Sequence, residues 1–125
     1  NADVAHAVGM QWYLPSPANY WAHENLDCAM TGLHDAGMYR KYLYGRGCAQ
    51  VSVDVRYGRL SREEAMSWVQ YHDGLFPTTY VGVHYREVID RLGMSAQALE
   101  VALDRFTNWE LFDANPELQR PQGPP

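Results

Sequence analysis

Basic side chains are concentrated in one short stretch of this 125-residue chain. Between Tyr39 and Arg62 the only acidic residue is Asp54. The same stretch holds six of the ten basic residues, which are Arg40, Lys41, Arg46, Arg56, Arg59 and Arg62. An arginine guanidinium presents a planar fork of donors that matches phosphate or carboxylate oxygens. The stretch is therefore either an anion-binding site or a set of solvated side chains that are neighbours only in sequence.

A second candidate site is the adjacent pair His34–Asp35. Imidazole and carboxylate exchange hydrogen bonds near neutral pH, so the pair could relay a proton or bind a sugar hydroxyl. The alternative is a partly buried histidine whose hydrogen bonds are satisfied within the fold, and the two residues alone favour that interpretation. His72–Asp73 is interpreted as structural, because a cation suits the C-terminal end of a helix.

The common catalytic motifs are missing from the sequence. It contains no GxxxxGK[ST] or SGGxDS-type phosphate loop, no GxGxxG, no HExxH and no GxSxG. Its two cysteines are too few for a disulfide scaffold, which indicates reduced thiols in a cytoplasmic protein. No apolar run approaches the ~18 residues of a membrane span. Acidic residues dominate outside the basic stretch, which disfavours nucleic acid as the main partner.

The clearest structural signals are helix boundaries. Ser61 and Glu64 form a capping box that predicts a helix start, and Asp73–Gly74 predicts its end. Ser95 can cap another helix. Two apolar stripes repeat at helical spacing, namely Tyr85, Val88, Ile89 and Leu92, and Leu99, Ala102, Leu103 and Phe106.

Two earlier segments give weaker signals. Residues 31–44 contain no proline and predict a helix, although Gly32 and Gly37 each disfavour it by ~1 kcal/mol relative to alanine. Val51–Val55 alternates like a strand, but it could also place its apolar residues on one helix face. A lone strand would have no partner here, so we predict a helix. The elements together predict an all-α fold, a small bundle of about five helices.

Composition divides the chain into three parts. Residues 1–23 are aromatic and interrupted by prolines, and we expect an irregular lead-in that continues from a preceding domain. Residues 24–113 form the predicted helical domain. Residues 114–125 hold four of the seven prolines and almost nothing apolar, which predicts a disordered tail.

Several motifs of the middle block stand in a recognisable order. They are Asn25-Leu26-Asp27, Thr31-Gly32-Leu33-His34-Asp35, Lys41-Tyr42-Leu43-Tyr44-Gly45-Arg46, Arg56-Tyr57-Gly58-Arg59-Leu60-Ser61-Arg62-Glu63-Glu64-Ala65 and Asp73-Gly74-Leu75-Phe76-Pro77. Together they resemble the C-terminal region of the N-acetyl sugar amidotransferases of bacterial surface-polysaccharide synthesis. The resemblance covers about residues 25–112.

The resemblance implies an ATP-dependent ligase of the PP-loop type that makes an acetamidino sugar for lipopolysaccharide (LPS) or a related glycan. Such an enzyme uses ATP and Mg²⁺, and it takes ammonia from a glutaminase partner. The ATP loop of the family lies in its N-terminal half, so we expect no cofactor in this chain and no activity from the isolated domain.

The expected contribution of this chain is therefore binding of a nucleotide-sugar substrate. The residues expected to bind its hydroxyls and phosphate are His34, Asp35, Arg46, Ser52, Arg56 and Arg59. The alternative is a non-catalytic module that docks the glutaminase or another ammonia-donating protein.

The chain departs from the family pattern in two places. Family members resemble Ala-Thr-Asp-His-Ala-Ser where this chain has residues 47–52, so Ala49-Gln50 replaces an Asp-His pair. Leu43 stands where a glycine is usual. If the Asp-His pair binds substrate or transfers a proton in the family, that function is altered in this protein.

Overall fold

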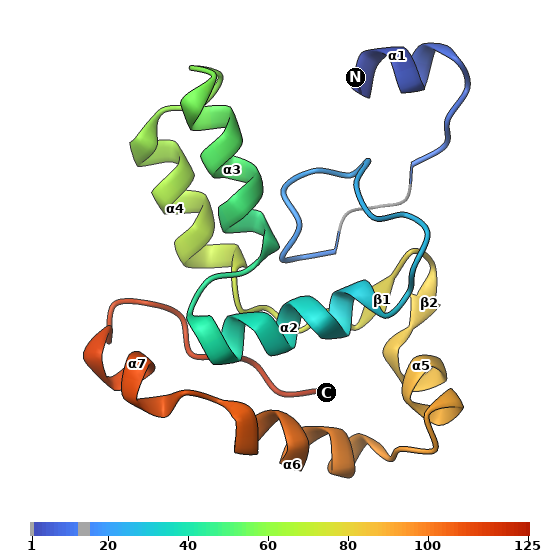
Figure 1. The fold of residues 1–125 in the computed structure, drawn as a ribbon, viewed down its shortest axis with the longest axis vertical. Coiled ribbons are helices and arrows are strands. Elements are labelled where there is room, and N and C mark those ends of the chain that lie inside the picture. The colour runs from blue at the N-terminus through green and yellow to red at the C-terminus, as the bar shows by residue number, and fades with distance from the viewer. Residues whose placement is uncertain (1, 13–15) are drawn as a thin grey trace.

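The computed structural model describes residues 2–12 and 16–125, and within them the fold is mostly helical, as the sequence predicts (Figure 1). The elements are α1 (Ala2–Ala7), α2 (Thr31–Tyr42), α3 (Arg46–Arg56), α4 (Arg62–His72), β1 (Thr79–Tyr80), β2 (Val83–His84), α5 (Tyr85–Arg91), α6 (Ala96–Phe106) and α7 (Trp109–Ala114). The helices form a small all-α bundle. No helix of the described residues is long and apolar enough to cross a membrane.

The predicted helix starts are confirmed in atomic detail. The Glu64 amide donates to Ser61 Oγ at 3.2 Å, and the Ser61 amide donates to Glu64 Oε2 at 2.9 Å. The Ala98 amide donates to Ser95 Oγ at 3.1 Å. These side chains satisfy amides that have no partner within the helix, so they fix where α4 and α6 begin.

The segment with the ambiguous pattern, Val51–Val55, is helical and lies inside α3. The structure also contains a short antiparallel hairpin, β1 and β2, that the sequence does not predict. Thr79 faces His84 and Tyr80 faces Val83 across it. Two-residue strands are too short to leave a period-two pattern in the sequence.

The hydrophobic core lies between α2, α5 and α6. Its buried members are Phe76, Tyr85, Ile89 and Leu99. Leu33 of α2 and Leu103 of α6 pack against them. The helices α3 and α4 pack mainly on each other, with Val51 and Ala65 buried, and they stand to one side of this core (Figure 1).

The proline-rich tail differs from the expected disorder, because it lies against α2 and α5 (Figure 1). The Tyr39 hydroxyl donates to the Gln119 carbonyl at 2.6 Å, and Arg40 Nη2 donates to the Gln122 carbonyl at 2.9 Å. The Tyr85 hydroxyl donates to the Pro125 carbonyl at 2.7 Å. Buried donors need acceptors, and the tail backbone supplies them.

Apart from one short helix, the described part of the lead-in is irregular, as expected. It contains α1, and residues 16–24 run beside α3. Trp21 Nε1 donates to Asp54 Oδ2 at 3.1 Å, and Asn19 Nδ2 donates to the Tyr80 hydroxyl at 3.2 Å. Residues 1 and 13–15 of the predicted lead-in lie outside the described residues.

Candidate functional site

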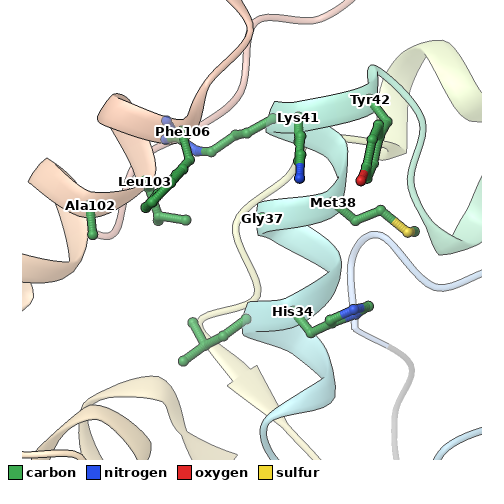
Figure 2. A pocket seen from close by; sticks show the side chains of 10 residues that line it. His34, Gly37, Met38, Lys41, Tyr42, Ala102, Leu103 and Phe106 are labelled. Carbon is green, nitrogen blue, oxygen red and sulfur yellow. The ribbon is translucent and has the colours of Figure 1, made fainter.

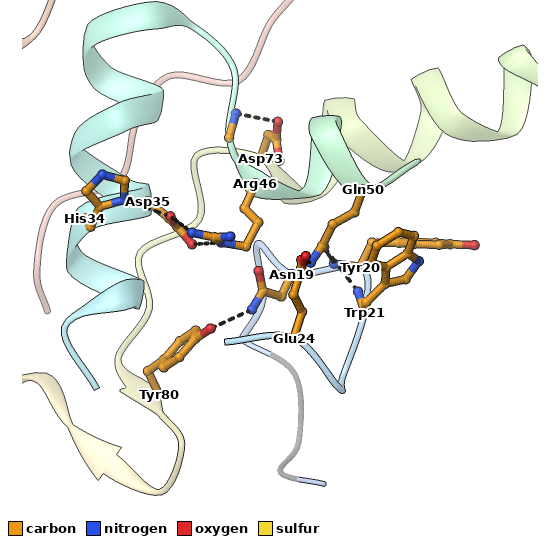
Figure 3. A network of polar contacts seen from close by, with 11 residues as sticks. Asn19, Tyr20, Trp21, Glu24, His34, Asp35, Arg46, Gln50, Asp73 and Tyr80 are labelled. Atoms are coloured by element: carbon orange, nitrogen blue, oxygen red, sulfur yellow. Dashed lines mark hydrogen bonds and ion pairs between the residues drawn. The ribbon is translucent and has the colours of Figure 1, made fainter. Parts of the chain in front are cut away.

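A buried carboxylate joins α2 to the start of α3 (Figure 3). Asp35 is 7% exposed. Arg46 Nε donates to Asp35 Oδ2 at 2.6 Å, and Arg46 Nη2 donates to Oδ1 at 3.0 Å. This two-point contact with Asp35 raises the pKa of Arg46. The guanidinium therefore compensates a buried charge within the fold.

His34 extends this contact to the surface. Its Nδ1 lies 3.1 Å from Asp35 Oδ1, and its side chain is 68% exposed. The Asp35 carboxylate is paired with Arg46 and can only accept, so the proton of this contact belongs to Nδ1. When the ring carries only that proton, Nε2 is an acceptor. The three residues form a chain, which we call the His34–Asp35–Arg46 relay.

Of these three residues, only His34 lines a groove of about 460 Å³ between α2 and α6 (Figure 2). His34 and Lys41 contribute polar groups, and Leu103 and Phe106 contribute apolar ones. Gly37 lies on the open face of α2, where an added Cβ would meet nothing within 4 Å. A mostly apolar groove with a few polar groups is typical of a small-molecule site.

The other predicted site residues lie elsewhere. Arg59 Nη1 forms an ion pair with Asp54 Oδ1 at 2.9 Å. Ser52 Oγ donates to the carbonyl of Ala49 at 2.7 Å, within its own helix. Ser52 and Arg56 both line a second groove, between α3 and α4. The structure therefore brings together His34, Asp35 and Arg46, and it separates them from Ser52, Arg56 and Arg59.

Gln50, which stands where the resemblance implies a histidine, holds the lead-in against α3 (Figure 3). Its Oε1 accepts from the Tyr20 amide at 2.7 Å and from the Trp21 amide at 3.1 Å. Its Nε2 donates to Glu24 Oε2 at 2.5 Å. An amide side chain can accept twice and donate at the same time, whereas a neutral imidazole has one acceptor and one donor. Gln50 has a structural role in this chain.

Asp73 caps α3 from outside the helix (Figure 3). The N-cap residue Gly45 has no side chain to do this, and its amide donates to Asp73 Oδ2 at 2.8 Å. Asp73 is 1% exposed, and its Oδ1 has no hydrogen-bond partner among the described residues. Burial raises the pKa of Asp73 to about 6, although the nearby Gly45 and Cys48 amides oppose the rise. Its position one residue after a helix gave no sign of this role.

Leu43 ends α2 in the left-handed conformation, with φ of 65°. Its amide donates to the Tyr39 carbonyl at 2.8 Å, so it closes the last turn. Glycine is favoured at such a position because a Cβ costs roughly 1–2 kcal/mol there. This geometry would suit the glycine that the resemblance implies at this position.

The fold and the grooves define a small helical domain with a candidate small-molecule site. The family model described as "LPS biosynthesis protein WbpG-like, C-terminal domain" matches residues 15–121, and the chain belongs to this family. It is therefore a domain of an LPS biosynthesis protein. The match extends into the proline-rich tail. No curated protein sequence and no solved structure gives a significant match.

Proposed function

We propose that this domain binds the sugar of a nucleotide-sugar substrate, as the C-terminal domain of an ATP-dependent N-acetyl sugar amidotransferase of LPS biosynthesis. The observation that carries the proposal is the His34–Asp35–Arg46 relay, whose His34 lines the α2–α6 groove. Membership of the LPS biosynthesis family supports the pathway. The ordered motifs support the amidotransferase class.

Each group of the groove has a distinct role in this proposal. His34 Nε2 accepts the proton of a sugar hydroxyl, while Asp35 holds the imidazole in one tautomer. The Lys41 ammonium lies in the same groove and supplies a positive charge for a phosphate. The Phe106 ring is 70% exposed and offers an apolar face. Arg46 acts as a positioning residue, since its donors already face Asp35.

The domain binds and orients in this scheme, and other parts of the enzyme perform the chemistry. The resemblance implies ATP and Mg²⁺ for a full-length member and ammonia from a glutaminase partner. The sequence has no phosphate loop, and the described residues contain no cluster of three His, Cys, Asp or Glu side chains that could hold a metal ion. We therefore assign ATP and Mg²⁺ to no residue of this chain.

Titration of the chain with UDP-N-acetylglucosamine, followed by amide NMR, tests the proposal. We expect shifts concentrated in α2 and α6, and about tenfold weaker binding for Gly37→Leu, which fills the groove from an open position. The matched control is Ser67→Leu, at an exposed position of α4. An absence of shifts in α2 and α6 at millimolar ligand would overturn the proposal.

The variant His34→Gln distinguishes the contribution of the relay to binding from that of the groove as a whole. Its side chain is largely exposed, so the fold tolerates the change. We expect a loss of UDP-N-acetylglucosamine affinity with unchanged thermal stability. Unchanged affinity would remove His34 from the binding site.

The second candidate function is a non-catalytic module that docks a glutaminase or another ammonia-donating protein. The observation that favours it is the exposed apolar surface near the N-terminal end of the described chain, where Val4, Val8, Met10 and Trp12 are exposed. Such side chains are typical of a protein interface. Val8→Ser with Trp12→Ser is expected to abolish capture of a purified glutaminase and to leave UDP-N-acetylglucosamine binding unchanged.

A further inference from the structure

Most of the basic stretch is already engaged within the fold. Arg46 and Arg59 are paired with aspartates. Arg40 is 5% exposed and donates to Thr107 Oγ1 at 3.0 Å. Lys41 lies over the Tyr42 ring, with 5.1 Å between Nζ and the ring centroid. Arg40, Arg46 and Arg59 are therefore not available for an anion, and Lys41 lines the α2–α6 groove.

The two remaining arginines converge. Arg56 is the last residue of α3 and Arg62 is the first residue of α4. The two helices are joined by residues 57–61, so the end of α3 and the start of α4 lie at the same end of the helix pair (Figure 1). Both are exposed, and neither forms an ion pair with any carboxylate of the described residues.

Arg56 and Arg62 line one groove of about 370 Å³ between α3 and α4. The rest of its lining is mainly apolar and includes Val51, Val55, Ala65, Met66 and Val69. From Cys48 to Val55 the groove follows about 10 Å of α3, at 1.5 Å per residue. The groove therefore has one basic end and a long apolar floor.

The electrostatics of both ends agree with this division. At the basic end the partial positive charge of the α4 N-terminus is opposed by the partial negative charge of the α3 C-terminus, so the positive charge there comes from the two arginines. The acidic side chain of Glu64 is turned back to the Ser61 amide, at 2.9 Å. Cys48 lies nearer the start of α3, and burial raises the pKa of its thiol, which therefore behaves as a small apolar group.

We propose that the α3–α4 groove binds an amphiphilic phosphate, with the phosphate between Arg56 and Arg62 and an apolar chain along Val51, Val55 and Val69. Two guanidinium groups match the oxygens of one phosphate monoester. The apolar floor adds about 25 cal/mol for each Å² of chain that it removes from water. This site shares no residue with the α2–α6 groove, so the two binding proposals are tested independently of each other.

Monomeric octyl phosphate is the probe, and binding to the full chain is followed by amide NMR. Octyl glucoside carries the same chain without charge, and inorganic phosphate carries the charge without the chain. We expect octyl phosphate to bind about tenfold more tightly than either, with shifts in α3 and α4. Equal affinity for octyl glucoside, or shifts confined to other helices, would overturn the proposal.

A comparison with lipid vesicles distinguishes a phosphate presented by a membrane from a phosphate on a single molecule. Phosphatidylcholine vesicles with added phosphatidic acid are compared with the octyl phosphate monomer. If the groove is the binding site, the chain binds monomeric octyl phosphate in the absence of any bilayer. Binding to the vesicles alone would instead indicate attraction to a charged surface, and it would contradict a groove site.

Three variants locate the site. Arg56→Gln with Arg62→Gln removes the phosphate contacts, and we expect about tenfold weaker binding of octyl phosphate. Ser52→Phe fills the groove and keeps its charge, and it is expected to weaken binding to a similar extent. The charge-matched control is Arg91→Gln with Arg105→Gln, which should change the affinity less than about twofold. An equal loss in the control would show non-specific attraction and overturn the assignment.

Discussion

Asp73 makes the stability of this domain depend on pH. Its pKa in the folded chain is about 6, above the ordinary value of 3.8. Between these values the folded state binds the proton more readily than the unfolded state does. The stabilisation is therefore fully present below about pH 4 and is lost as the pH rises through 6. Burial without an opposing charge within hydrogen-bond distance is the cause.

The variant Asp73→Asn tests this pH dependence. The asparagine oxygen can still accept from the Gly45 amide, and the ionisation is gone. We expect the wild-type chain to lose on the order of 2–3 kcal/mol relative to the variant between pH 4 and pH 7. Urea unfolding at several pH values measures the difference.

The control for this measurement is Asp90→Asn, at an exposed position of α5. The Asp90 side chain is exposed to water in the folded and in the unfolded chain. The stability difference between Asp90→Asn and the wild type should therefore vary less with pH. A difference for Asp73→Asn that stays constant between pH 4 and pH 7 would contradict the assignment.

At the scale of elements, two helical glycines have opposite roles. A Cβ on Gly37 of α2 would meet nothing within 4 Å, whereas a Cβ on Gly47 of α3 would overlap the Trp68 ring and lie 2.8 Å from the Ala18 carbonyl. Gly37→Ala should stabilise the chain by about 0.5–1 kcal/mol through helix propensity. Gly47→Ala should destabilise it by about 1–3 kcal/mol through overpacking. Thermal unfolding of the two variants compares them, and similar shifts would contradict the helix packing.

The sequence predicted the elements whose signals are local. The capping box of α4 and the stripes of α5 and α6 lie within about a dozen residues each, and all three helices are confirmed. The hairpin was missed because its strands have two residues each. The helix α7 was missed for a similar reason, since it has six residues and its start depends on Asn108.

The candidate site was predicted only in part. The contact between His34 and Asp35 follows from their adjacency in the sequence. The contact between Asp35 and Arg46 requires α2 and α3 to meet, and no local pattern encodes that meeting. Gln50 binds residues 20–24, about thirty positions away, so its role needed the tertiary fold. Amino-acid composition also predicted a disordered tail. Composition carries no information about the side-chain donors of α2 and α5 that bind the tail carbonyls in the folded chain.

At the scale of the whole molecule, the tail belongs to the packed domain. Deleting residues 115–125 leaves the Tyr39 and Tyr85 hydroxyls and Arg40 Nη2 without the acceptors that they have in the structure. Each unsatisfied buried group costs about 1–3 kcal/mol. We expect a loss of about 3 kcal/mol or more in chemical unfolding.

Glu117→Ala in the full-length chain is the control for the deletion. It changes the charge of the tail and touches none of these hydrogen bonds, so its effect should stay within about 0.5 kcal/mol. A deletion that leaves the stability unchanged would mean that the tail does not pack in solution.

The separation of the α3–α4 pair from the hydrophobic core has a consequence for hydrogen exchange. The core cluster contains no residue of α3 or α4, and polar contacts such as Asp35–Arg46 connect the pair to the rest. Water can replace such contacts at little cost in apolar exposure. The pair should therefore open as a cooperative unit before the chain unfolds globally. Native-state exchange is expected to report a lower opening free energy for amides of α3 and α4 than for those of α5 and α6, with Arg46 and Asp73 at the boundary between the two units.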